Sequence, residues 1–162
     1  MVDIQDNFLP RPELEFLQNC FSQVNWKVSR CVSVKDLMCK SIENFQLIHE
    51  FYSNYKPQTE HFDVLMPLLR KIKPSALIRV KANLNPRTHE IVEHGFHIDH
   101  TAENGKTSIF YVNTNNGYTL FEDGSKIESI ENRFITFNSS LRHSSSTCTD
   151  TEARIVINFN YF

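Results

Sequence analysis

The stretch "RIVINFNYF", residues 154 to 162, decides the fold. Successive side chains of a strand point to opposite faces, so this stretch divides into two sets. The apolar set is Ile155, Ile157, Phe159 and Tyr161, and the other set is Arg154, Val156, Asn158 and Asn160. One face of the predicted strand therefore belongs to an apolar core, and polar groups line much of the opposite face.

The second half of the chain repeats this period of two. In "ALIRVKANL", residues 76 to 84, Ile78 and Val80 alternate with Arg79 and Lys81. Four further runs are rich in β-branched and aromatic residues: "TSIFYVN", "YTLF", "KIESI" and "FITFN". The letters "NNG" at 115 to 117 and "DG" at 123 to 124 indicate turns. Several short antiparallel strands of this kind predict a sandwich or a small jelly-roll barrel.

The first half has helical spacing instead. Apolar positions three or four apart predict three helices between residues 11 and 73. Their apolar sets are Leu14, Leu17 and Phe21; Leu37, Ile42, Phe45 and Ile48; and Val64, Leu65, Leu68, Leu69 and Ile72. Pro12 and Pro67 suit first helical turns. A strand could run through "WKVSRCVSV", residues 26 to 34.

Length and composition favour one globular domain. A chain of 162 residues can bury a core of its own, and 40% hydrophobic with 22% charged residues is an ordinary composition. We therefore predict a single domain that is mainly β with flanking α-helices. Residues 1 to 75 would be mostly helical support, and residues 76 to 162 would form the jelly-roll core.

Charge and hydropathy narrow the kinds of binding partner and the location that the sequence predicts. The net charge of −2 gives no sign of a dedicated nucleic-acid surface. No apolar run approaches the ~18 residues of a membrane span. The N-terminal "MVDIQDNFLP" carries acids where a signal peptide would carry positive charge. We expect a cytoplasmic protein without a membrane partner, and no pattern indicates an oligomeric state.

The stretch "EHGFHIDHTAENG", residues 93 to 105, is dense in metal-ligating residues. If it forms a strand, His97 and Asp99 point to the same side. His143, at the end of "FITFNSSLRH", can supply a third ligand from a neighbouring element. Two imidazoles and one carboxylate suit a non-haem Fe(II) centre with open positions, although a catalytic zinc would accept the same set. His94 and His100 are expected in the loop or beside the ligands.

Arg154 adds a cation to this pattern. It follows His143 in the chain and starts the polar face of the last predicted strand, from where it could reach into the barrel. A guanidinium offers two parallel donors to a carboxylate. The sequence thus combines a metal site with a possible carboxylate anchor.

A histidine, an aspartate two positions later, a distant histidine and a following arginine resemble a known pattern. The likeness is to the Fe(II)- and 2-oxoglutarate-dependent oxygenases with a double-stranded β-helix core, particularly their prolyl-4-hydroxylase-like branch. The core strands of that branch look like "TSIFYVN", "GYTLF", "NRFITFNSSLRH" and "ARIVINFNYF". The stretches "DNFLPRPELEFLQNCF" and "ALIRVKANLNPRT" resemble those of small phage-encoded members.

The resemblance implies a role for each site residue. His97, Asp99 and His143 would bind Fe(II), while Arg154 and Tyr111 would hold the distal carboxylate of 2-oxoglutarate. Asn83 is expected as a further co-substrate contact.

The resemblance also implies a reaction. O2 would be consumed, an unactivated C–H bond hydroxylated, and succinate and CO2 released, with ascorbate as reductant. The substrate would be a prolyl residue of a protein or peptide, or a small molecule. A phage-encoded enzyme would work in the host cytoplasm.

The sequence departs from the pattern at two places, and two alternatives to the oxygenase hypothesis stay open. Collagen-type relatives usually carry lysine at the position of Arg154, and the strand before the metal motif often carries a tyrosine where this chain has Lys81, Asn83 and Asn85. A non-catalytic metal- or peptide-binding jelly roll is one alternative. A zinc enzyme on the same scaffold is the other.

Overall fold

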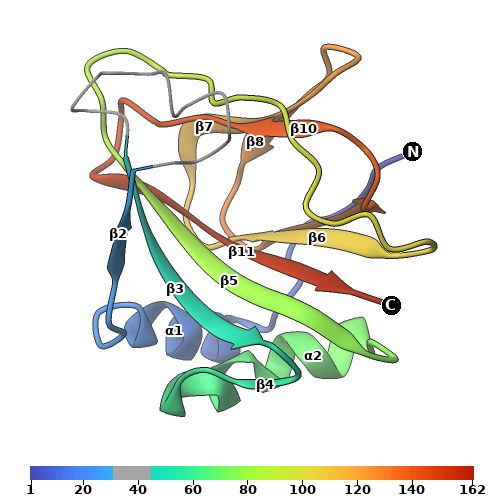
Figure 1. Cartoon of the computed structure of the whole chain (residues 1–162). Helices are drawn as coiled ribbons and strands as arrows, with labels where there is room; N and C mark the ends of the chain where they lie inside the picture. Colours follow the sequence, from blue (N-terminus) through green and yellow to red (C-terminus); the bar gives the residue numbers. More distant parts are fainter. Residues whose placement is uncertain (31–44) are drawn as a thin grey trace.

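The structure is a computed structural model that describes residues 1 to 30 and 45 to 162. These residues form two facing β-sheets and a helical layer (Figure 1). The larger sheet contains β1 (Asp3–Gln5), β2 (Lys27–Ser29), β3 (Gln46–Ser53), β4 (Lys56–Pro57), β5 (Leu77–Pro86), β6 (Lys106–Tyr111), β9 (Arg133–Asn138) and β11 (Ala153–Tyr161). The smaller sheet contains β7 (Asn115–Phe121), β8 (Lys126–Ser129) and β10 (His143–Ser145). The helices are α1 (Arg11–Cys20), the 3-10 helix η2 (Glu60–Leu65) and α2 (Met66–Ile72).

Strand order identifies a jelly roll. The larger sheet runs β1-β9-β6-β11-β5-β3-β2, with β4 beside β3, and the smaller sheet runs β10-β7-β8. All strand pairs between these elements are antiparallel. The helices α1 and α2 cover the outer face of the larger sheet (Figure 1). The predicted fold class, mainly β with flanking helices around a jelly-roll core, is confirmed.

β11 lies at the centre of the larger sheet, between β5 and β6, and its two faces differ as the sequence predicts. Ile157 and Phe159 are fully buried in the core that the sheet shares with α1 and α2. Val156, on the opposite face, packs in the smaller core between the two sheets with Phe121 and Phe137. The polar face of β11 thus looks into the space between the sheets.

Removing residues 158 to 162 should abolish the cooperative unfolding transition. The deletion takes away the second half of the ladder that β11 forms with β5 and most of the ladder with β6, and it empties the fully buried site of Phe159. Loss of one buried phenylalanine side chain alone costs about 3–5 kcal/mol, much of the total stability of a domain. Thermal unfolding followed by circular dichroism measures this. Phe162→Ala is the control, because that side chain is 42% exposed; an unchanged melting curve of the truncated chain would contradict the placement of β11.

The first 75 residues contain more strand than the sequence predicts. α1 and α2 occur as expected, with Pro12 and Pro67 in their first turns. The predicted helix through Phe45 and Ile48 is wrong in its described part, because Gln46–Ser53 forms β3. Pairing with β5 and packing of Phe51 in the core outweigh the local helical spacing. Its positions 37 and 42 lie outside the described residues, as does the end of the strand expected over residues 26 to 34.

One of the two predicted turns is confirmed. Gly124 adopts a left-handed φ of 86° between β7 and β8, as a tight turn requires. The turn predicted at residues 115 to 117 is wrong, because these residues begin β7. A glycine at position 117 is explained by space instead of by a turn. A Cβ atom there would lie 2.6 Å from Arg154 Cδ and 2.6 Å from the Thr147 carbonyl oxygen. The glycine makes room for the arginine.

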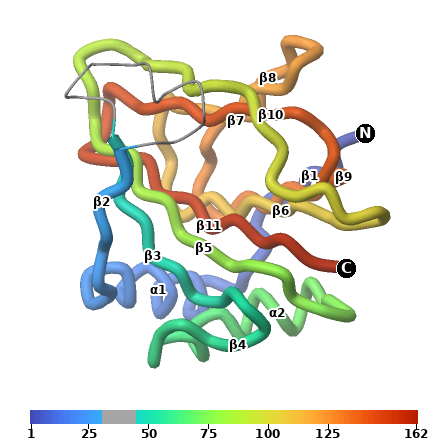
Figure 2. The backbone as a smooth tube through the Cα atoms, in the orientation of Figure 1, coloured from blue at the N-terminus to red at the C-terminus, as the bar shows by residue number. Residues whose placement is uncertain are grey.

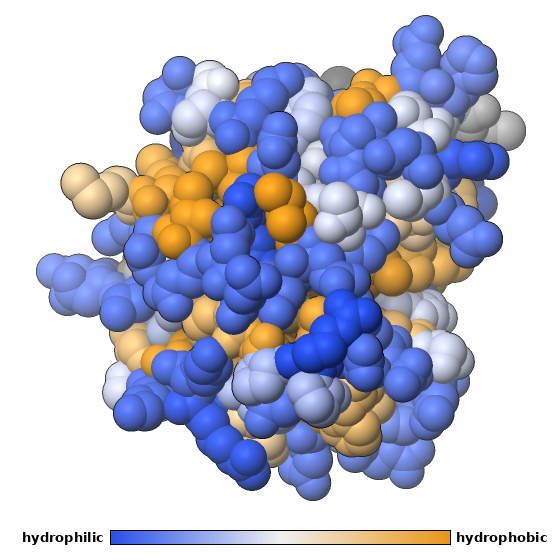
Figure 3. All heavy atoms as spheres, turned by 180° about the vertical axis from the view of Figure 1, so that it is seen from behind, coloured by the Kyte–Doolittle hydropathy of each residue, from blue (hydrophilic) through white to orange (hydrophobic). Residues whose placement is uncertain are grey.

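The rear surface carries apolar patches separated by hydrophilic side chains (Figure 3). This mixed pattern is usual for a solvated surface. Among the described residues, no helix has both the length and the apolar character that crossing a membrane demands.

Candidate metal centre and adjoining cavity

The loop between β5 and β6, residues 87 to 105, brings the metal motif to the smaller sheet, where it passes beside β10 (Figure 2). His97 and His143 form an isolated antiparallel bridge, with backbone hydrogen bonds of 2.9 and 3.0 Å between them. The strand expected around His97 is reduced to this bridge and one at Glu93. A single bridge still suffices to fix His97 against β10.

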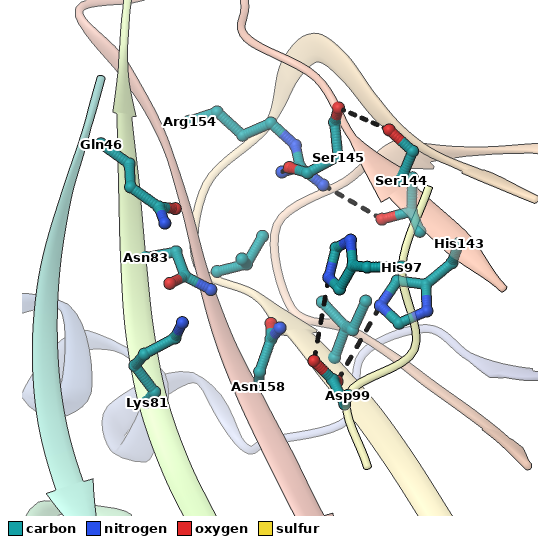
Figure 4. A pocket seen from close by; sticks show the side chains of 13 residues that line it. Gln46, Lys81, Asn83, His97, Asp99, His143, Ser144, Ser145, Arg154 and Asn158 are labelled. Atoms are coloured by element: carbon teal, nitrogen blue, oxygen red, sulfur yellow. Dashed lines mark hydrogen bonds and ion pairs between the residues drawn. The ribbon is translucent and has the colours of Figure 1, made fainter. Parts of the chain in front are cut away.

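Three side chains meet at this bridge. The ligating atoms of His97, Asp99 and His143 all lie within 4.8 Å of one another (Figure 4). His97 Nε2 is 3.8 Å from Asp99 Oδ1, and His143 Nε2 is 3.9 Å from Asp99 Oδ2. Within the described part of the chain this is the one group of three or more such side chains that could hold a metal ion.

Both imidazole rings are turned so that Nε2 faces the centre. The Nδ1 atom of His97 lies 3.2 Å from the Gly95 carbonyl oxygen, and that of His143 lies 3.1 Å from the Leu141 oxygen. A carbonyl only accepts, so each Nδ1 carries the proton and each Nε2 presents a lone pair. His143 Nε2 is buried without a hydrogen-bond partner among the described residues. Burial lowers the pKa of His143 despite the opposing charge of Asp99, which favours the neutral ring that a metal ligand needs.

Two neighbours orient the carboxylate of Asp99, whose side chain is only 4% exposed. Arg79 donates to Oδ1 at 3.3 Å, and Asn160 Nδ2 donates to Oδ2 at 3.0 Å. Burial alone would raise the pKa of Asp99, but the charges of His143 and Arg79 and the hydrogen bond from Asn160 hold it below its ordinary value. The carboxylate is therefore ionised and fixed in direction, which fits a divalent cation.

Asn160→Ala should weaken the binding of Mn(II), used as a redox-stable probe, by about 10- to 100-fold, the usual effect of removing a partner that orients a metal ligand. The variant frees Asp99 to rotate away from the two histidines. Calorimetric titration of the metal measures the change. Asn158→Ala is the matched control, since it lies on the same strand face without a bond to Asp99. Equal affinities of the two variants would show that Asn160 does not orient the ligand.

A cavity of about 440 Å³, partly open to solvent, adjoins the three residues. The residues that line it are Gln46, Lys81, Asn83, His97, Asp99, Ile109, Thr119, His143, Ser144, Ser145, Arg154, Val156 and Asn158. They come from both sheets and from the loop that carries the metal motif.

Arg154 is a buried cation on the wall of this cavity, with 0% of its surface exposed. Its guanidinium donates to three hydroxyl oxygens, at 2.7 Å to Ser129, 2.7 Å to Ser145 and 3.1 Å to Thr119. No carboxylate pairs with it among residues 1 to 30 and 45 to 162. Because a buried charge is costly unless an opposite charge balances it, the cavity favours an anionic ligand.

Comparison with known proteins bears on the fold. No protein-family model and no curated protein matches the sequence. Solved structures do match: a 2-oxoglutarate-Fe(II) oxygenase family protein from Burkholderia pseudomallei has a TM-score of 0.72 and 10% identity, covering 99% of this chain and 84% of that one. The chain has the fold of the 2-oxoglutarate- and Fe(II)-dependent oxygenases.

Two further solved structures have the same fold. A prolyl hydroxylase from Trichoplax adhaerens, in complex with a peptide fragment, has a TM-score of 0.68 and 16% identity, covering 99% of this chain and 83% of that one. HygX from Streptomyces hygroscopicus, with nickel, 2-oxoglutarate and hygromycin B bound, has a TM-score of 0.62 and 10% identity, covering 99% and 82%. At these identities the likeness establishes the fold.

Two of the expected co-substrate contacts occupy different places within this oxygenase fold. Asn83 lines the cavity, and its Oδ1 has no hydrogen-bond partner among the described residues. Tyr111 is fully buried and lies behind the cavity wall. Its hydroxyl donates to Thr119 Oγ1 at 2.8 Å, and its ring lies 5.6 Å from Arg154 Cζ. Tyr111 therefore does not line the cavity itself and contacts it through Thr119, which does.

The remaining histidines of the motif do not join the group of three. His94 is buried in the loop, and His100 Nδ1 accepts the Ala102 backbone N–H at 3.2 Å. Four residues that sequence reasoning missed carry a signal, because the alternation of β5 and β11 places them on the polar face. Lys81 and Asn158 line the cavity, and Arg79 and Asn160 bond Asp99. Thr119 and Ser145 gave no such signal, since small hydroxyl residues are common in strands.

Proposed function

We propose that this chain is an Fe(II)- and 2-oxoglutarate-dependent dioxygenase that hydroxylates an unactivated C–H bond. One observation carries the proposal: a preorganised His97–Asp99–His143 cluster and a buried Arg154 without a carboxylate partner in the described chain share one cavity. Two histidines and one carboxylate leave coordination positions open, as an oxygenase iron requires. The shared oxygenase fold supports the same reading.

His97, Asp99 and His143 would hold Fe(II). When bound, the metal with 2-oxoglutarate and O2 supplies the oxidising chemistry, with succinate and CO2 as by-products and ascorbate as reductant. The protein contributes the orientation of its ligands: the Gly95 and Leu141 carbonyls fix both rings. The near-complete burial of His143 keeps water from its side of the site.

Arg154 would pair with the distal carboxylate of 2-oxoglutarate. The three hydroxyls that accept from its guanidinium hold the group in one direction, and Tyr111 supports Thr119 from behind. Ile109 and Val156 give the same cavity an apolar wall for the carbon chain between the two carboxylates. Asn83 lines the same cavity, and its Nδ2 would donate to a carboxylate or keto oxygen.

For the substrate we propose a prolyl residue of a peptide. This finer step rests on the likeness to the peptide-bound prolyl hydroxylase and to a prolyl-4-hydroxylase from Pseudomonas putida, which has a TM-score of 0.61 and 11% identity. Proline-containing peptides incubated with the protein should gain one oxygen atom by mass spectrometry. Oxygen gain by small molecules only, in a parallel screen, would reject the prolyl assignment and keep the oxygenase.

The reaction class is tested by succinate formation from 2-oxoglutarate with Fe(II) and ascorbate under air. Slow uncoupled turnover should appear without the substrate and should depend on His143. If neither succinate nor joint binding of metal and 2-oxoglutarate is detected, the chain is a metal- or peptide-binding jelly roll or a zinc enzyme.

A further inference from the structure

A second cation, Lys81 on β5, lies on the same cavity wall. Its side chain is half-buried, and no hydrogen bond or ion pair engages its ammonium within residues 1 to 30 and 45 to 162. Burial and the neighbouring charge of Arg79 lower its pKa, while Asp99 and Glu50 oppose the shift without contacting it. A partly desolvated ammonium with no acceptor, facing a cavity, is a binding site for an anion.

Strand register places Lys81 at the metal end of the cavity. Lys81 pairs with Asn158 of β11, whereas Arg154 pairs with Asn85. The two cations are thus anchored four residues apart along the strands, or about 13 Å between their backbones. Asn160, which holds Asp99, is the next residue of β11 on the same face as Asn158. Arg154 therefore marks the far end of the cavity.

The close-up agrees with this order. Lys81 and Arg154 extend from opposite ends of the wall, with Asn83 between them, and Asn158 lies beside Lys81 on the side toward Asp99 (Figure 4). The metal group and the two cations thus enclose one space. The two positive charges of Lys81 and Arg154 match in number the two negative charges of a dicarboxylate.

We propose that Lys81 is the second anion anchor of this cavity and that its ammonium binds the carboxylate of 2-oxoglutarate at the metal end, while Arg154 binds the distal carboxylate. The inference rests on the proposed function. Lys81 is a positioning residue here: it fixes which end of the dicarboxylate lies beside His97, Asp99 and His143. A carboxylate of the substrate has the same chemistry, so the test must separate the two sources.

Calorimetric titration under anaerobic conditions with saturating Mn(II) provides the test. The ligands are 2-oxoglutarate and 2-oxopentanoate, which has a methyl group in place of the distal carboxylate. The proteins are the unaltered chain, Lys81→Met, Lys81→Arg and Arg154→Met. Lys81→Met should weaken both ligands by the same factor, about 10- to 100-fold for a hydrogen bond to a charged group. Lys81→Arg should retain most of the affinity, and Arg154→Met should weaken only 2-oxoglutarate.

Several outcomes would overturn the assignment. If Lys81→Met binds both ligands with unchanged affinity, Lys81 does not contact 2-oxoglutarate. A defect in substrate turnover alone would then assign the ammonium to a carboxylate of the substrate. Weakening of 2-oxoglutarate only would place Lys81 beside the distal carboxylate. Reduced affinity of Lys81→Met for Mn(II) alone, or a lower melting temperature, would show a structural role. If the unaltered protein binds neither ligand, the proposed function itself fails.

Discussion

Replacing His143 by alanine should abolish metal binding and, with it, the formation of succinate. The residue supplies a buried Nε2 lone pair that no other described group uses, and its backbone bridges to His97. Removing a partner that merely orients a ligand costs 10- to 100-fold in metal affinity, so loss of a ligand should cost at least about 100-fold. Mn(II) titration and succinate assays measure the two effects.

His100→Ala is the matched control for this experiment. His100 lies in the same loop, three residues after His97, but outside the group of three. Most of the metal affinity and turnover should remain in this variant, provided that its melting curve is unchanged. The reverse ranking of the two variants would move the metal site away from His143.

Arg154→Met should weaken 2-oxoglutarate binding strongly while leaving the fold at least as stable. Truncating one partner of a buried charge pair costs about 2–5 kcal/mol, or roughly 30-fold to several thousand-fold in affinity. The ligand-free protein, by contrast, loses a buried charge that no carboxylate of the described chain balances, so its melting temperature should hold or rise. Calorimetry with Mn(II) present and thermal unfolding without ligand measure the two effects.

The two measurements must be read together. Mn(II) affinity should stay the same, because Arg154 lies at the far end of the cavity from Asp99. A large fall in melting temperature with equal loss of metal and co-substrate binding would mean that Arg154 is a structural residue that holds Ser129, Ser145 and Thr119 in place.

The strands of the second half were predictable because each has a constant environment on each face. β5 and β11 pack against helices on one side and border the cavity on the other, so apolar and polar residues largely alternate along them. β3 lies toward the edge of the sheet, and its spacing also satisfies a helix. Only pairing with β5 decides between the two, and a pairing partner distant in sequence is invisible to local periodicity.

The metal-ligating residues of the candidate site were predictable from the sequence, but the residues that orient them and the co-substrate contacts were less so. The types and order of His97, Asp99 and His143 sufficed to suggest a cluster, although the strand expected around His97 is only a bridge. Tyr111 and Thr119 differ, because their roles depend on a hydrogen bond between β6 of one sheet and β7 of the other. The local sequence pattern carries no information on that contact.

The nine residues of β11 also tie the cavity to the helical core. A slip of one position would carry Arg154 into the apolar layer under α1 and α2 and would bring Phe159 into the cavity. A molecule with the wrong register would therefore fail to fold, instead of folding without a site. Correct folding of the unaltered chain therefore implies a correctly placed Arg154. A preparation that unfolds cooperatively has the arginine in the cavity wall, so the ligand affinity of that preparation can be stated per folded molecule.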